Sequence, residues 1–292
     1  MTSPALAPVA WECVLHVLAH APLNDPASLH DARYLRHVHA RLPAHAWNAA
    51  ADDGTLVATL HARAGADAWA LQCLAVMHRD GRQLRMVSRR PLHDVGDGEV
   101  AERWALKALR ALATRHEALV EVVRADVGLA AGAYLDAYES VWGDAMRRAL
   151  EEVRAAFERA AEVAPALKGV PVYLSSVLGA RGRALGAMPA ILVGAPLAWN
   201  ELAPEHAVIQ ALHERAVMLA EGGGGDARSR YVVAEWRALR AVERLVAGTA
   251  LAEARARWAS RFDLSGVARE AEERGEAGDE AVDDLVARLR GA

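Results

Sequence analysis

Residues 190–217 read AILVGAPLAWNELAPEHAVIQALHERAV, and this stretch decides the fold. Its first five residues are apolar and end at a glycine, which predicts a short buried strand. A turn follows, and Pro204 stands where a helix would begin, because proline is tolerated in the first helical turn. The apolar spacing after Pro204 predicts an amphipathic helix. That helix carries the dipeptide His213-Glu214.

The dipeptide His213-Glu214 is half of a metal-binding motif. In many zinc hydrolases, a strand leads into a helix whose His-Glu pair supplies a metal ligand and a general base. The complete motif has a second histidine four residues after the first, one turn further along the same face. Val217 occupies that position. The sequence therefore predicts the frame of a metal site that lacks one ligand.

Composition excludes several classes of function. The 292-residue chain has a net charge of −4, which argues against nucleic acid as a partner. It has no apolar run of about 18 residues, so no membrane span is expected, and its first residues make a poor signal peptide. We therefore expect a cytoplasmic protein. Cys13 and Cys73 lie among apolar residues and are expected to be free thiols. Abundant alanine and arginine are typical of a GC-rich bacterial genome.

Hydrophobic periodicity predicts a mainly α fold of the α+β class, with a change of texture partway along the chain. Helices are expected at residues 8–21, 28–41, 56–63, 66–78, 83–89, 99–116, 118–133 and 138–164. Short strands are then expected at residues 170–179, 181–186 and 190–194, followed by helices at 204–220, 231–247, 251–259 and 285–289. Loops are expected at residues 91–98 and 222–226, and a mobile polar tail at 270–280. We predict a helical domain over 1–135, and a domain over 136–292 in which two or three strands at about 170–195 lie against helices.

Over residues 138–258, the order of elements resembles the gluzincin class of zinc metallopeptidases. A long helix is followed by strands, by the helix with His213-Glu214, and by a helix with glutamates. In that class the last strand borders the substrate cleft, the next helix carries HExxH, and a later helix supplies a glutamate ligand. The resemblance implies a zincin-like fold, a zinc cofactor, and a peptide or protein as substrate or partner. No nucleotide cofactor is expected, because the glycine-rich segment at residues 179–186 lacks the P-loop and dinucleotide-binding patterns.

The resemblance can be carried over residue by residue. His213 matches the first metal ligand and Glu214 the general base. Glu235, in YVVAEWRAL, matches the downstream carboxylate, and Glu243 is the second choice. Val217 matches nothing. With only His213 and Glu235 from the protein, the zinc would have two protein ligands instead of three.

Two nearby polar residues do not replace the missing ligand. His206 lies seven residues before His213, which places it about 10 Å away along the helix. Two ligands of one zinc have donor atoms roughly 3–4 Å apart. Gln210 is close enough, but an amide is a poor zinc ligand. The alternative interpretation is structural: His213 would be a core histidine, and Glu214 a solvated partner of an arginine.

Histidines are concentrated near the N-terminus. His16 and His20 are spaced i,i+4, which places two imidazoles on one helix face, and His37 and His39 follow on the next predicted helix. The simpler interpretation is that these are surface histidines on two helices. A third hypothesis is that this segment folds over the C-terminal cleft and supplies the missing ligand.

Arg181 and Arg183 lie in the glycine-rich segment GARGRALG at residues 179–186. The segment lacks the Lys-Ser/Thr of a P-loop and the glycine spacing of a dinucleotide site. The two arginines are therefore either exposed turn residues or ligands for a substrate carboxylate at a cleft edge.

Two functions remain open. The first is a divergent metal-dependent hydrolase of peptide or amide bonds, with an incomplete HExxH motif. In that enzyme Glu214 would take a proton from metal-bound water. The second is a non-catalytic helical protein that binds a protein or peptide on a metallopeptidase-like scaffold. An iron-dependent oxygenase is a third option, and it too requires the missing histidine.

Overall fold

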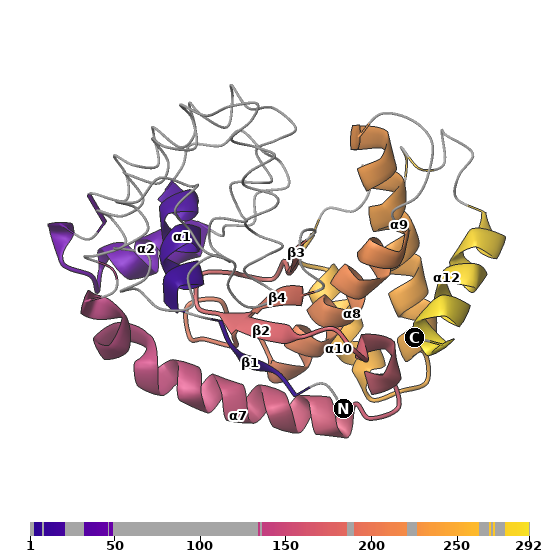
Figure 1. Cartoon of the computed structure of the whole chain (residues 1–292), viewed down its shortest axis with the longest axis horizontal. Helices are drawn as coiled ribbons and strands as arrows, with labels where there is room; N and C mark the ends of the chain where they lie inside the picture. Colours follow the sequence, from indigo (N-terminus) through magenta and orange to yellow (C-terminus); the bar gives the residue numbers. More distant parts are fainter. Residues whose placement is uncertain are drawn as a thin grey trace, which may run out of the picture. The chain divides into compact units, whose positions relative to one another are not determined.

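The computed structural model describes residues 3–7, 9–20, 32–45, 47–48, 134, 136–185, 190–220, 227–262, 269, 271 and 278–291. Within these residues the chain is mainly helical, with one small mixed sheet (Figure 1), as the sequence predicts. The chain divides into two compact units. The N-terminal unit comprises residues 6–147 and 175–178, and the C-terminal unit comprises residues 1–5, 148–174 and 179–292. Among the described helices, none combines the length and apolar character needed to cross a membrane.

The sheet has four strands in the order β1-β2-β4-β3. Their bounds are β1 Ala5–Leu6, β2 Val172–Ser175, β3 Arg183–Leu185 and β4 Ala190–Gly194. Each of the three predicted strand regions contains a strand, which confirms those predictions. The prediction that the sheet has two or three strands confined to about residues 170–195 is wrong, because β1 comes from the N-terminus. Two residues are too few to show the alternation by which a strand is recognised.

Among the described strands, β3 lies at the edge of the sheet and runs antiparallel to β4. Ala184 faces Ile191 across this pair. The backbone N–H of Ala184 donates to the carboxylate of Glu214. Since opposed residues in an antiparallel ladder alternate between hydrogen-bonded and non-hydrogen-bonded pairs, Ala184 belongs to a non-hydrogen-bonded pair. Its main-chain groups therefore point away from β4, toward the side on which no described strand lies.

The described helices largely follow the predicted ones. In the N-terminal part they are α1 Val9–His20 and α2 Ala32–His39, and then a π-helical turn Glu139–Gly143, α7 Asp144–Arg159 and a 3₁₀ turn Ala164–Leu167. The C-terminal helices are α8 Pro204–Ala220, α9 Ala227–Val246, α10 Leu251–Ala259 and α12 Asp279–Gly291. The predicted single helix over 138–164 is thus a π-helical turn followed by α7, which ends five residues early at Arg159, and the 3₁₀ turn begins where the prediction ends. The predicted helices at 56–63, 66–78, 83–89, 99–116 and 118–133, and the predicted loops at 91–98 and 222–226, lie outside the described residues.

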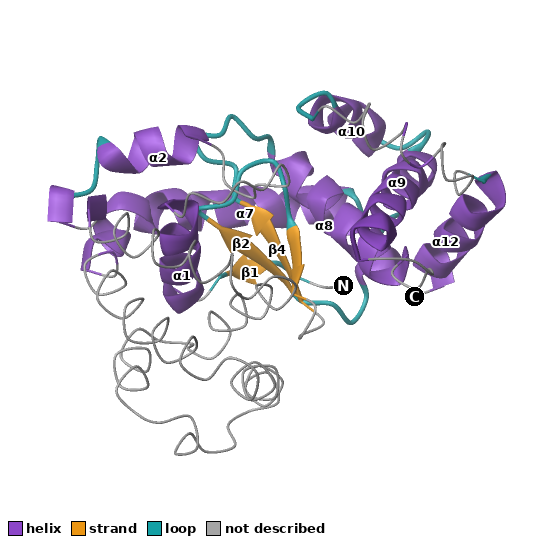
Figure 2. Ribbon diagram, turned by 90° about the horizontal axis from the view of Figure 1, so that it is seen from above, coloured by secondary structure: helices purple, strands orange, loops and turns teal. Residues whose placement is uncertain are grey.

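Helix α8 is the centre of the C-terminal unit. It contacts β3 and β4 on one side and α9, α10 and α12 on others. Figure 2 shows the strands, α8, α9 and α12 in succession, and Figure 1 shows the same order from another side. A helix covered on several sides buries residues all round and not along a single stripe. Its most buried apolar residues, Ile209, Ala211, Leu212 and Ala216, have no exposed side-chain surface.

Polar side chains fix the entry of the chain into α8. Asn200 accepts hydrogen bonds from the backbone N–H groups of Leu197 and Leu202 and donates to the carbonyl of Ala195. Gln210 accepts from the N–H of Gly194, at the end of β4. These bonds satisfy buried main-chain groups that no strand or helix pairs. They set the position of α8 against the sheet, and with it the position of His213.

Candidate functional site

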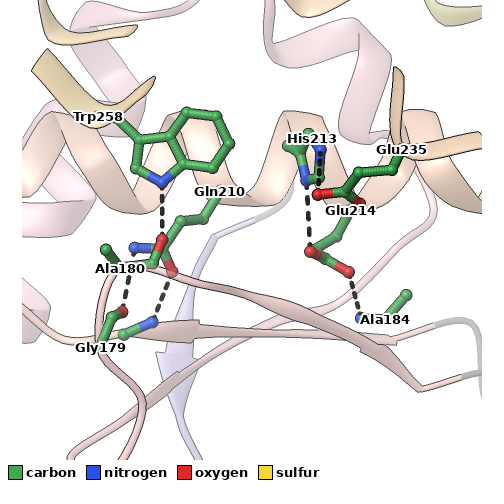
Figure 3. A network of polar contacts seen from close by, with 9 residues as sticks. Gly179, Ala180, Ala184, Gln210, His213, Glu214, Glu235 and Trp258 are labelled. Carbon is green, nitrogen blue, oxygen red and sulfur yellow. Dashed lines mark hydrogen bonds and ion pairs between the residues drawn. The ribbon is translucent and has the colours of Figure 1, made fainter. Parts of the chain in front are cut away.

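Helices α8 and α9 bring His213 and Glu235 together (Figure 3). The imidazole Nε2 of His213 lies 3.7 Å from Oε1 of Glu235. On the other side of the ring, Nδ1 lies 3.4 Å from Oε1 of Glu214. The side chains of His213, Glu214 and Glu235 are 4%, 12% and 11% exposed. The site is therefore a buried imidazole between two carboxylates, and we call these three residues the His213 triad.

Glu214 is held at both of its oxygens. Oε1 contacts His213, and Oε2 accepts a 2.8 Å hydrogen bond from the N–H of Ala184 on β3. The close approach of this strand depends on Gly182, where an added Cβ would lie 2.9 Å from Cγ of Glu214. Glu214 is thus not the solvated side chain of the alternative interpretation. It orients the imidazole, much as carboxylates orient metal-binding histidines from behind.

The two carboxylates favour a protonated His213. Burial lowers the pKa of His213, but the charges of Glu235 and Glu214 and the hydrogen bond to Glu214 outweigh it, and the net direction is upward. Burial raises the pKa of Glu214, but the hydrogen bond and charge of His213, with Arg183 and the N–H of Ala184, bring it below its ordinary value. Both directions favour the charged forms of the two groups, and a buried charge beside an opposite charge is compensated without water.

Aromatic rings lie on one side of the His213 triad. The ring of His213 lies 5.2 Å from that of Trp258 on α10, and Trp258 lies 5.0 Å from Phe262. The guanidinium of Arg181 stands 4.9 Å from the centre of the Phe262 ring, a cation–π distance. Trp258 also donates from Nε1 to the carbonyl of Ala180. The segment with Arg181 and Arg183 is therefore attached to the same site, and their role toward a substrate stays a prediction.

The residues around His213 do not fit a catalytic zinc. Val217, at the position of the missing histidine, is only 7% exposed and belongs to the core. In the part of the chain that the structure describes, no three His, Cys, Asp or Glu side chains form a metal-binding group. A catalytic zinc needs three protein ligands, and the described residues supply two. Zinc and the metal-ligand roles of His213 and Glu235 stay predictions.

The other residues considered near His213 have local structural partners. Nδ1 of His206 accepts from the N–H of Ala203, and burial lowers the pKa of His206 to about 4, with help from Arg261 and Arg257. Gln210 bonds the main chain, as described above. Glu243, the second choice for a carboxylate ligand, pairs with Arg240 and Arg255. None of these contacts involves His213.

The N-terminal unit contains a second buried polar cluster that sequence reasoning missed. The carboxylate of Glu12 accepts hydrogen bonds from both the N–H and the hydroxyl of Ser176. The hydroxyl of Tyr134 lies 3.5 Å from that of Ser176 and 3.5 Å from that of Tyr34, which in turn lies 2.8 Å from Nδ1 of His16. These five side chains are buried. In the sequence, only the i,i+4 spacing of Glu12 and His16 points to this cluster. Ser176, the partner of Glu12, lies 164 residues further along the chain.

The histidines of α1 and α2 do not act as one group. His16 is fully buried and stacks on Tyr134 at 4.2 Å, so the prediction that it lies on the surface is wrong. His20 points its Nε2 at Nε2 of His39, 3.2 Å away, instead of sharing a point with His16. His37 stacks on Trp142 at 5.0 Å. The hypothesis that this segment supplies a ligand near His213 stays a prediction.

Comparisons with known proteins add no assignment to this geometry. No protein-family model, curated protein sequence or solved structure matches the chain.

Glu235→Gln should lower the pKa of His213, because Glu235 is the largest influence that opposes burial. The amide keeps the shape of the carboxylate and removes its charge. Titration of the His213 ring protons by NMR measures the shift. The control is Glu243→Gln, on the same helix but paired with arginines, which should leave the His213 titration unchanged. An unchanged titration in Glu235→Gln would mean that Glu235 does not act on the imidazole.

Proposed function

We propose that the chain is a non-catalytic protein that binds an extended peptide beside β3, on a metallopeptidase-like scaffold. The observation that carries this proposal is the hydrogen bond from the N–H of Ala184 to Glu214. A general base must be free to accept a proton from water, and Glu214 instead holds a main-chain donor and the imidazole of His213. The apolar, buried Val217 also argues against catalysis.

The same hydrogen bond marks where a peptide would bind. Edge strands offer main-chain groups to an added strand, and proteins block such edges when they are empty. In the C-terminal unit, Oε2 of Glu214 occupies the place that a carbonyl oxygen of an added strand would take against Ala184. A peptide that displaces Glu214 would form the bond through its own main chain. Arg181 and Arg183 directly precede Ala184 in the chain, which favours peptides with acidic residues.

If the peptide binds as an added strand, the effect of backbone methylation on its affinity should alternate from one residue to the next. Linear peptides selected from a random pool on the full chain should lose affinity when their backbone nitrogens are methylated at every second position, and only there. This is expected because alternate residues of an added strand face the partner edge. Fluorescence anisotropy measures each affinity, with the scrambled peptide as the control. Uniform effects of methylation, or cleavage of the peptide, would contradict the proposal.

Variants at Glu214 sharpen the test. Glu214→Ala removes the competing acceptor and should tighten peptide binding by about fivefold, the scale of one net hydrogen bond. Glu214→Gln keeps an oxygen acceptor for Ala184 and is the matched control, with affinity near that of the wild type. Weaker binding in Glu214→Ala would show that Glu214 does not compete with the peptide.

A second candidate, the divergent metal-dependent hydrolase, is favoured by one distance. The 3.7 Å between Nε2 of His213 and Oε1 of Glu235 suits two ligands of one ion. A third ligand would have to come from outside the described residues. Elemental analysis of wild type and His213→Ala, both purified without added metal, separates the two functions. Stoichiometric metal in the wild type that is lost in the variant would favour the hydrolase.

A further inference from the structure

We propose that His20 and His39 form a binding site for a divalent transition-metal ion on the N-terminal unit. His20 is the last residue of α1 and His39 the last residue of α2. Their Nε2 atoms face each other at 3.2 Å. With metal–nitrogen bonds of about 2.0–2.1 Å in a tetrahedral arrangement, two imidazole ligands place their nitrogens about 3.3 Å apart. The two side chains already stand at the separation that one ion requires.

The protonation of His20 suits metal binding. Nδ1 of His20 lies 2.9 Å from the carbonyl oxygen of His16. A carbonyl oxygen only accepts, so Nδ1 carries the proton, and in the neutral ring Nε2 presents its lone pair to His39. Metal-binding histidines have this arrangement, in which one ring nitrogen donates to a carbonyl or carboxylate and the other binds the ion.

Burial of His20 favours the neutral form of its imidazole. Partial burial lowers the pKa of His20, the hydrogen bond to the carbonyl of His16 opposes this, and the charge of His39 lowers it further. The net direction is downward. A neutral imidazole is the form that binds metal. Without metal, Nε2 of His39 donates a proton to the hydrogen bond with Nε2 of His20. To bind metal through Nε2, the His39 ring has only to carry that proton on its own Nδ1 instead.

Neighbouring rings hold both ligands in place. The ring of His16 lies against that of His20 at 4.7 Å, and the indole of Trp47 lies 4.6 Å from the ring of His39. Two imidazoles from fixed helices lose little freedom when they bind an ion. Imidazole ligands suit Cu²⁺, Ni²⁺ and Zn²⁺, whereas Mg²⁺ and Ca²⁺ prefer oxygen. The site therefore selects the first group, with Cu²⁺ bound most tightly.

The test is a titration of the full chain with Cu²⁺, followed by calorimetry and by tryptophan fluorescence. Cu²⁺ quenches nearby indoles, so Trp47 reports occupancy of this site. His39→Ala and His20→Ala should each weaken binding at least about tenfold, because one imidazole alone makes a poor site. His45→Ala, which removes an exposed histidine just beyond α2, is the matched control and should bind as the wild type does.

Two further measurements keep the result unambiguous. Trp47→Phe should abolish most of the quenching while the calorimetric affinity stays the same. His39 is exposed, so His39→Gln should fold even if His20→Ala does not, and circular dichroism checks each variant. Cu²⁺ affinity that is equal in wild type and His39→Gln would overturn the proposal. An equal loss in His45→Ala, or tighter binding of Mg²⁺ than of Zn²⁺, would also overturn it.

Discussion

Between pH 4.5 and about pH 8 the free energy of unfolding of the wild type should fall by about 3 kcal/mol, and Glu12→Gln should abolish this fall. Glu12 lies on α1 and has no exposed surface. Burial raises its pKa from 4.5 to about 7, and the hydrogen bonds of Ser176 and Ser175 only partly oppose this. The folded protein therefore holds the proton of Glu12 more tightly than the unfolded chain does.

Stability falls as the pH rises because the pKa of Glu12 is higher in the folded protein than in the unfolded chain. Below pH 4.5 the carboxyl is protonated in both states, and its contribution to stability is fully present. As the pH rises through 4.5 toward 7, the unfolded chain releases the proton first, so the free energy of unfolding falls. Above about pH 8 both states are ionised and the loss is complete. Glutamine has no proton to release, and its oxygen can still accept from Ser176.

Urea unfolding of wild type and Glu12→Gln at a series of pH values measures the effect. The difference between their free energies of unfolding should grow in favour of the variant from pH 4.5 to pH 8. The control is Glu152→Gln, an exposed glutamate on α7, which should follow the wild type. Parallel pH profiles for wild type and Glu12→Gln would show that Glu12 is not a buried acid with a raised pKa.

Local signals predicted the elements of the C-terminal unit well. Helices α8 and α10 begin and end where the sequence places them, because Pro204 and the loss of apolar spacing mark their ends. Helix α12 is longer than the predicted 285–289, since its first turns are acidic and resemble a polar tail. Strand β1 was missed because its two residues gain their structure from pairing and not from their own sequence.

Contacts between distant segments were harder to predict than elements. The pairing of His213 with Glu235 was expected from a resemblance in the order of elements, and the structure places the two side chains 3.7 Å apart. The bond from Ala184 to Glu214 and the pairing of His20 with His39 were missed. Spacing along one helix shows which residues share a face, but not which side chain of another element meets them. Packing between helices and strands decides that.

Val217→His should raise the affinity for Zn²⁺ on the order of 100-fold if α8 descends from a zinc-binding helix. The substitution completes HExxH with i,i+4 spacing after His213. Glu235, 3.7 Å from His213, is placed to complete a set of three ligands. The two carboxylates, which raise the pKa of His213, would then share its imidazole with a metal. If the resemblance is accidental, the variant only buries an unpaired polar group in place of a buried valine.

Isothermal titration of Zn²⁺ into wild type and variant measures the change. The control is Met218→His, which adds a histidine one residue further along α8, off the face of His213, and should bind Zn²⁺ as the wild type does. Adding Glu235→Gln to Val217→His should reverse most of the gain, because it removes the carboxylate ligand. Val217→Cys tests the same position with a smaller side chain that packs well and also binds zinc. Folded variants at Val217 that bind no more zinc than Met218→His would end the gluzincin resemblance as a guide to this site.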